Sequence, residues 1–187
     1  DQALGYRSLL RDETTGLYHH FWLEQTGRPY IIGWGRGQGW ALLGLLDVAC
    51  HVPRNMVGAE LVVQAAKDLA DVMLSYQRDD GHWFNMVHEP RSGEESSTAA
   101  FMATAFYRGI EQGFLDRDRF MPAADAAYRA MLGKLEPNGD YRGVTAAVYS
   151  STCDEHYWYV PSDRIVPWGQ GPVLTAAAAR AAIHGTI

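Results

Sequence analysis

An internal repeat of about sixty residues constrains the fold of this 187-residue chain more than any other feature. Three turns each place Asp or Asn before a glycine and an aromatic residue shortly after it, in Asp12–Tyr18, Asp79–Trp83 and Pro137–Tyr141. Asx side chains bond the backbone of such turns, where glycine readily adopts a positive φ. The turn glycines Gly16, Gly81 and Gly139 lie 65 and 58 residues apart. This period predicts stacked units that cannot bury their apolar faces alone.

The same kinds of segment flank each turn. A helix with apolar positions at three- and four-residue steps precedes it, in Ala3–Leu10, Leu61–Tyr76 and Ala123–Leu135. A loop and a more apolar, Ala-rich helix follow it, in Arg36–His51, Ser96–Glu111 and Gly169–His184. Helices that are apolar on most sides are buried, whereas the preceding helices keep a charged face. We therefore predict two concentric helical layers, an all-α fold of the α/α toroid type.

The length of the chain covers about three helical hairpins, half of what a closed six-hairpin toroid needs. We expect residues 1–187 to form a single, partial α/α-barrel domain. The N-terminal half of the barrel or a second chain would complete it. Asp1 is not an initiator Met, and we expect it not to be the natural start. Candidates for short strands lie only in the loops, at Tyr30–Ile32, Val144–Tyr149 and Tyr157–Val160.

Composition excludes several classes of function. The chain has 16 Lys plus Arg against 22 Asp plus Glu and no basic run, which argues against nucleic-acid binding. Its longest apolar run, Trp40–Leu46, is far too short to span a membrane. Cys50 and Cys153 belong to no zinc-binding motif. We favour two structural thiols in a reducing, cytoplasmic compartment, with a single disulfide as the alternative.

Polar and aromatic side chains collect before the inner helices, which start at one rim of a toroid. Arg36 and Trp40 lie one helical turn apart and share a helix face. An arginine can bind a carboxylate with two hydrogen bonds, and a helix N-terminus adds partial positive charge. A tryptophan can stack on the apolar face of a sugar. Together they predict a site for an acidic sugar.

Several residues here have a second interpretation. Trp34 and Trp168 precede equivalent helices and could wedge the helices apart. The glycines between Gly33 and Gly39 follow no βαβ pattern, so helix packing explains them better than a phosphate loop does. Glu94 and Glu95 could cap the helix that follows them or belong to the site. Adjacent side chains diverge, so His19 and His20 do not predict a metal site.

Three motifs resemble glycoside hydrolase families 88 and 105, the unsaturated glucuronyl and unsaturated rhamnogalacturonyl hydrolases. They are Thr15–His20, Trp34–Trp40 and Glu94–Phe101, in the order and at the spacing of the family. The Trp-x-Arg-Gly-x-x-Trp element within Trp34–Trp40 is the most specific of them. The resemblance covers nearly the whole chain and implies a six-hairpin α/α barrel.

The resemblance also implies a reaction. The family removes a terminal unsaturated galacturonic or glucuronic acid from lyase-generated oligosaccharides by vinyl-ether hydration, without a cofactor. An Asp protonates C4 of the double bond, water adds at C5, and the hemiketal collapses. No residue of this chain matches that Asp, which is expected upstream of Asp1, so the chain alone is expected to be inactive. Asp47 lies too deep in a helix to replace it.

The resemblance assigns substrate binding to five residues, His20, Trp34, Arg36, Gln38 and Trp40. The chain departs from the family pattern at His19, at Gly35 and in the segment 144–167. Two other functions stay open. One is a non-catalytic carbohydrate-binding half-barrel that uses the same aromatic residues. The other is a sugar isomerase similar to N-acylglucosamine 2-epimerase, with histidines as acid and base.

Overall fold

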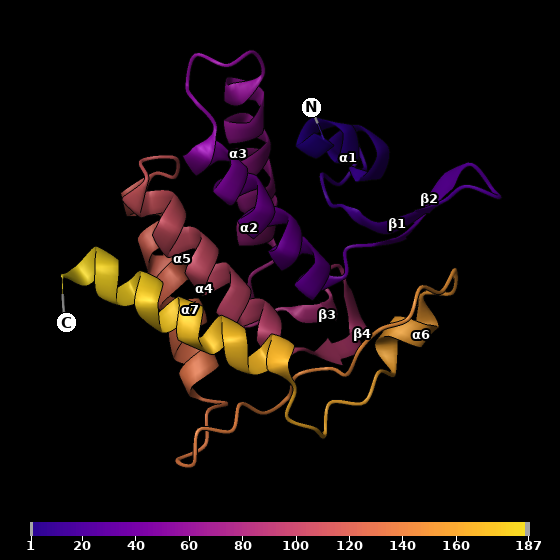
Figure 1. Ribbon diagram of the computed structural model, residues 1–187. Helices are drawn as coiled ribbons and strands as arrows, with labels where there is room; N and C mark the ends of the chain where they lie inside the picture. The colour runs from indigo at the N-terminus through magenta and orange to yellow at the C-terminus, as the bar shows by residue number, and fades with distance from the viewer. Residues whose placement is uncertain (1, 186–187) are drawn as a thin grey trace.

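The computed structural model describes residues 2–185, which form helices and two short hairpins (Figure 1). The elements are α1 Gln2–Leu10, β1 His19–Leu23, β2 Arg28–Ile32, α2 Gly35–His51, α3 Ala59–Ser75, β3 Phe84–Met86, β4 Glu89–Glu94, α4 Ser96–Glu111, α5 Arg117–Leu132, α6 Glu155–Trp158 and α7 Pro167–His184. The six long helices occupy the ranges predicted from the sequence to within a few residues at their ends, except that α5 begins at Arg117, six residues before the predicted Ala123.

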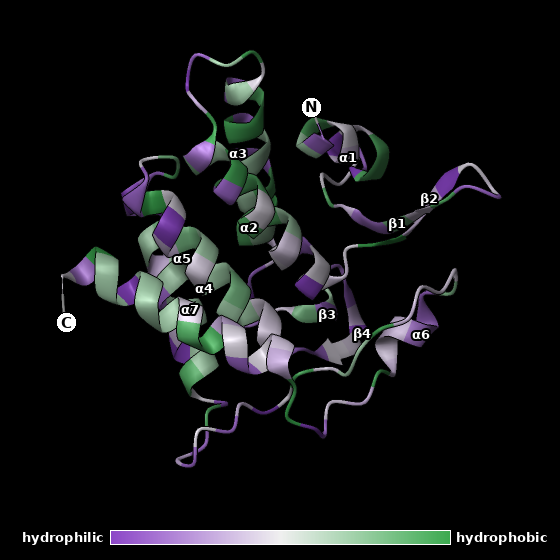
Figure 2. Cartoon of the chain, in the orientation of Figure 1, coloured by the Kyte–Doolittle hydropathy of each residue, from purple (hydrophilic) through white to green (hydrophobic). Residues whose placement is uncertain are grey.

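The long helices form two layers. The inner helices α2, α4 and α7 lie side by side, while α3 packs behind α2 and α5 behind α4 (Figure 1). Helix α4 is buried along nearly its whole length, because α2, α5 and α7 all pack against it. Hydrophilic residues concentrate in the connecting loops and at the tip of the β1–β2 hairpin (Figure 2). The predicted all-α architecture of stacked hairpins is confirmed.

The repeated turns have the predicted backbone geometry. Gly16, Gly81 and Gly139 adopt φ angles of 74°, 84° and 90°. A Cβ at Gly81 would lie 2.4 Å from the carbonyl oxygen of Ala126, so this turn excludes any side chain. In the first turn, the Asp12 carboxylate accepts hydrogen bonds from two backbone N–H groups. The repeat therefore marks three equivalent helix-to-loop transitions.

Within residues 2–185 the strands lie only in the loops before α2 and α4. β1 pairs with β2, and β3 with β4, both antiparallel. The prediction at Tyr30–Ile32 is confirmed as part of β2, whereas β1, β3 and β4 were not predicted. The predictions at Val144–Tyr149 and Tyr157–Val160 are wrong, since Val144–Tyr149 forms no strand and Tyr157 lies in α6. Among residues 2–185 no strand follows β4, and the buried Tyr157 packs instead against Ile31 of β2 and Met86 of β3.

Helix α2 packs closely against α4 through its glycines. A Cβ at Gly35 would lie 2.6 Å from Oγ1 of Thr98, and one at Gly39 would lie 2.6 Å from Cβ of Phe101. The packing interpretation of these glycines is confirmed. The alternative of a disulfide is wrong, because Cys50 and Cys153 are both free thiols. No helix among residues 2–185 is both long and apolar enough to cross a membrane.

Candidate functional site

A groove of about 710 Å³ lies between α1, the start of β1, α2 and α3. Its floor and far end are apolar, lined by residues such as Leu4, Leu45, Val48, Val52 and Val62. Its other end holds four of the five predicted substrate residues, His20, Trp34, Gln38 and Trp40. Arg36 is the one predicted residue that does not line it. The structure thus brings aromatic and polar groups from β1 and α2 to one end of a largely apolar groove.

Trp40 is the exposed aromatic residue at this end of the groove. It is 54% exposed, yet one side of its indole packs against Phe101 with the ring centroids 4.6 Å apart. It also borders a second hollow of about 550 Å³ between α2, α4 and α7. An exposed but supported indole loses little conformational freedom when it binds, so Trp40 suits stacking on a sugar ring.

His20 lies against the indole of Trp34, with the ring centroids 4.5 Å apart. Its Nδ1 is 2.5 Å from the phenol oxygen of Tyr157. Burial, reinforced by the positive charge of Arg36, lowers the pKa of His20, which therefore stays neutral near pH 7. The Nε1 of Trp34 is buried and has no hydrogen-bond partner among residues 2–185.

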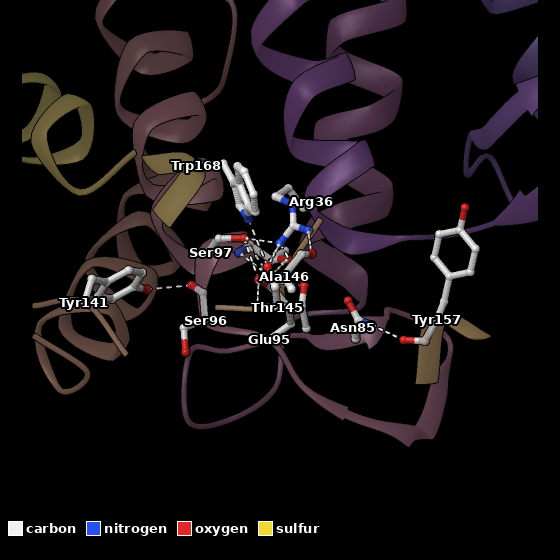
Figure 3. Close-up of polar contacts among 11 residues, drawn as sticks. Arg36, Asn85, Glu95, Ser96, Ser97, Tyr141, Thr145, Ala146, Tyr157 and Trp168 are labelled. Carbon is white, nitrogen blue, oxygen red and sulfur yellow. Dashed lines mark hydrogen bonds and ion pairs between the residues drawn. The ribbon is translucent and has the colours of Figure 1, made fainter. Parts of the chain in front are cut away.

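Arg36 is buried beneath the groove, with an exposed fraction of 2%. Its guanidinium lies 2.9 Å from the carboxylate of Glu95 and 2.8 Å from the hydroxyl of Thr145. Figure 3 shows these residues together. Arg36 also donates to the carbonyl oxygens of Thr145 and Ala146. Its Cζ lies 4.9 Å from the ring centroid of Trp34. In this geometry Arg36 holds the loop 144–146 and supports Trp34, and both of its Nη atoms already donate to protein acceptors.

The two glutamates before α4 behave differently. The Glu95 carboxylate is fully buried and accepts a hydrogen bond from the backbone N–H of Thr98 at 3.0 Å, so it caps α4. Glu94 forms ion pairs with Lys134 at 2.7 Å and Arg78 at 3.2 Å on the partly exposed side. The capping interpretation is confirmed for Glu95, which also provides the counter-ion of Arg36.

Gln38 is likewise committed to the backbone. Its Oε1 accepts from the N–H of Tyr18 and its Nε2 donates to the carbonyl of the same residue, both at 2.8 Å. Gln170 makes the matching pair of bonds in the third unit, to the N–H of Tyr141 and the carbonyl of Gly139. Gln38 therefore fixes the chain that carries His20 against the start of α2.

Thr145 and Asn85 are site residues that the sequence analysis missed. Thr145 accepts from both Arg36 and the indole N–H of Trp168, and Asn85 donates to the backbone carbonyl of Tyr157. Both lie in irregular or short segments, where no periodicity marks a buried position. Within residues 2–185, no three His, Cys, Asp or Glu side chains are grouped so as to hold a metal ion.

The sequence model of the family Glycosyl Hydrolase Family 88 matches residues 1–183 of this chain. The chain belongs to this family. The unsaturated rhamnogalacturonyl hydrolase YesR of Bacillus subtilis is 27% identical over 179 residues, which cover 95% of this chain and 50% of that protein. The unsaturated 3S-rhamnoglycuronyl hydrolase of Formosa agariphila is 31% identical over 102 residues, which cover 54% of this chain and 27% of that protein.

Solved structures show the same fold. A possible member of the GH105 family from Salmonella enterica superposes with a TM-score of 0.90 at 20% identity, covering 98% of this chain and 49% of that one. The unsaturated glucuronyl hydrolase of Bacillus sp. GL1 superposes with a TM-score of 0.67 at 21% identity. The match covers 98% of this chain and 51% of that one. The family 88 chain thus supplies about half of an α/α toroid and spans about half the length of these proteins.

Proposed function

We propose that the protein carrying this chain is a glycoside hydrolase that removes a terminal 4,5-unsaturated galacturonic or glucuronic acid from lyase-generated oligosaccharides. Membership of family 88 and the names of its relatives support this activity. The observation that carries it is local: an exposed Trp40 and a neutral His20 share one groove. Such a site offers a stacking surface and a hydrogen-bonding group for one sugar ring.

The five predicted residues divide into two roles in this proposal. Trp40, His20 and Trp34 contact the sugar, through the indole rings and through a hydrogen bond from the imidazole. Arg36 and Gln38 act indirectly, by holding other parts of the site. The Nη atoms of Arg36 bind Glu95 and the loop at Thr145, and the amide of Gln38 binds the backbone of Tyr18. The charge of Arg36 is balanced by Glu95 and contributes little net attraction for the uronate.

The reaction follows from the chemistry of the vinyl ether. A proton is added to C4 of the C4=C5 bond, and water adds to the oxocarbenium carbon C5 and releases a proton. The resulting hemiketal opens its ring, and the anomeric centre that this exposes expels the next sugar. We assign the proton donor to no residue of this chain and place it in the other half of the barrel.

That other half would also cover the apolar end of the groove. The apolar residues Leu45, Val48 and Val62 line it on α2 and α3, as expected of a surface against which a further hairpin packs. We propose that residues 1–187 are one part of a single barrel domain, completed by the N-terminal half of the barrel or by a second chain. The two free thiols agree with a cytoplasmic location, which we propose on that ground.

The test is an assay of the complete gene product with an unsaturated uronyl disaccharide. Hydration removes the double bond, so the proposal predicts a steady loss of its ultraviolet absorbance and release of the second sugar. Binding of the disaccharide with no loss of absorbance would instead support a carbohydrate-binding half-barrel. Interconversion of a saturated amino sugar with its epimer, with the unsaturated substrate untouched, would support the isomerase.

A further inference from the structure

The long connection between α5 and α7 contacts His20, a groove residue, through one buried side chain, Tyr157 of the short helix α6. Its exposed fraction is 1%, although its neighbour Tyr159 is 77% exposed. The ring packs in a small apolar cluster with Ile31, Trp34 and Met86. These three residues come from β2, the start of α2 and β3, so three separate segments define the position of the phenol.

The backbone of Tyr157 is fixed as well. The side-chain amide of Asn85, in β3, donates a hydrogen bond to the Tyr157 carbonyl (Figure 3). The Tyr157 N–H donates to the carbonyl of Asp154 at 2.9 Å. The phenol oxygen then lies 2.5 Å from Nδ1 of His20, across 137 residues of sequence. Because both the backbone and the ring of Tyr157 are fixed, its phenol is well suited to orient the side chain of His20.

The protons of this pair can be placed. Burial raises the pKa of Tyr157 to about 12, so the phenol keeps its proton at neutral pH. Burial and the charge of Arg36 lower the pKa of His20, so the imidazole is neutral and has one nitrogen lone pair to accept that proton. The other acceptor near the phenol, the carbonyl of Tyr149, is farther away at 3.4 Å. The phenol therefore donates to Nδ1.

This bond determines what His20 offers to a ligand. A neutral imidazole that accepts at Nδ1 carries its hydrogen on Nε2. Nε2 has no hydrogen-bond partner among residues 2–185, and His20 lines the groove. We propose that Tyr157 is a positioning residue that holds His20 in the Nε2–H tautomer, so that His20 donates a hydrogen bond to an oxygen of the sugar. The inference rests on the proposed function for the identity of the ligand, but the tautomer itself does not depend on it.

The test compares the complete gene product with its Tyr157→Phe variant by ¹⁵N NMR of the histidine rings. Phe keeps the ring that packs on Trp34 and removes only the donor. Wild type should show His20 as the Nε2–H tautomer. The variant should show a mixture of tautomers, with the His20 titration moved to higher pH by about one unit, because a donor that stabilises the neutral ring is lost. Tyr159→Phe, at the exposed residue that follows α6, should change neither signal.

A kinetic measurement on the same variants links the tautomer to function. Tyr157→Phe should lower kcat/KM for the unsaturated disaccharide roughly fivefold, the effect of one net hydrogen bond, and Tyr159→Phe should leave it unchanged. An Nδ1–H tautomer in the wild type, or a His20 titration that Tyr157→Phe does not move, would overturn the proposal whatever the activity. Absence of turnover in the wild type, with the predicted NMR result, would instead overturn the proposed function alone.

Discussion

The guanidinium of Arg36 and the carboxylate of Glu95 form an ion pair of 2.9 Å whose side chains are almost completely buried. The pair joins the start of α2 to the start of α4, and Thr145 of the α5–α7 connection bonds to both residues. Moving two charges out of water is costly, and only good geometry with additional hydrogen bonds offsets that cost. The contacts of Glu95 with Ser97 and Thr98 provide those bonds.

Arg36→Ala should destabilise the protein by about 3–5 kcal/mol, because it leaves the Glu95 carboxylate buried without a counter-ion. Denaturant unfolding followed by circular dichroism measures the change. Arg119→Ala is the matched control, since its ion pair with Asp71 is about half exposed and should contribute less than about 1 kcal/mol.

A double variant separates the two roles that Arg36 could have. Arg36→Met with Glu95→Gln removes both charges and should recover much of the stability lost in Arg36→Ala. If Arg36→Ala instead stayed as stable as the wild type and lost only its affinity for a uronate, Arg36 would bind the carboxylate directly. The proposal that Arg36 supports Trp34 and the loop 144–146 without contacting the sugar would then be wrong.

Trp40→Ala should weaken substrate binding between about threefold and tenfold, the usual range for one aromatic contact. Its stability should change little, because more than half of the side chain is exposed. A calorimetric titration with an unsaturated disaccharide measures the affinity. Trp22→Ala removes another partly exposed tryptophan that does not line the groove, and it should bind as the wild type does.

Gly39→Ala should destabilise the protein by about 2 kcal/mol, because the new methyl group would overlap with Cβ and Cγ of Phe101. Gly44→Ala lies in the same helix and meets no atom within 4 Å, so it should stabilise α2 by about 0.5–1 kcal/mol. Thermal unfolding of the two variants gives the comparison. Equal effects of both would show that α2 and α4 do not pack as closely as described.

Stability should decrease as the pH falls below about 6.5, the ordinary pKa of histidine. Burial lowers the pKa of His20 and His82 in the folded protein. Between these lowered values and 6.5 the unfolded chain binds more protons, so the free energy of unfolding decreases with decreasing pH and is at its full value above 6.5. Asp12 and Glu94, whose pKa values are also lowered, lose their contribution only below 3.8 and 4.5.

Denaturant unfolding at about pH 7.5 and about pH 5.5 measures this decrease. His82→Gln should make the decrease smaller, since it removes one of the two buried imidazoles that resist protonation. A free energy of unfolding that is constant between these pH values would show that neither histidine is buried in the neutral form.

Much of the architecture could be predicted because it depends on local patterns. The Asx-Gly turns located Gly16, Gly81 and Gly139, and helical periodicity located the six long helices within a few residues, except at the start of α5. For the candidate site, the sequence predicted which residues lie close together better than it predicted their contacts. His20, Trp34 and Trp40 meet in one groove as expected, whereas Arg36 and Gln38 turn out to be occupied by protein partners. Periodicity does not report such partners, because they come from loops far away in sequence.

Repetition, turn chemistry and apolar spacing in the chain were enough to establish a layered helical half-barrel with its polar residues at one rim. These properties depend on residues a few positions apart, so they can be predicted from the sequence alone. The burial of Arg36 against Glu95, the position of Thr145 and the contact of Tyr157 with His20 arise only when distant loops dock on the helix starts. A hydrogen bond across 137 residues has no local signature, because the energy of that bond depends on distance and angle rather than on separation in sequence.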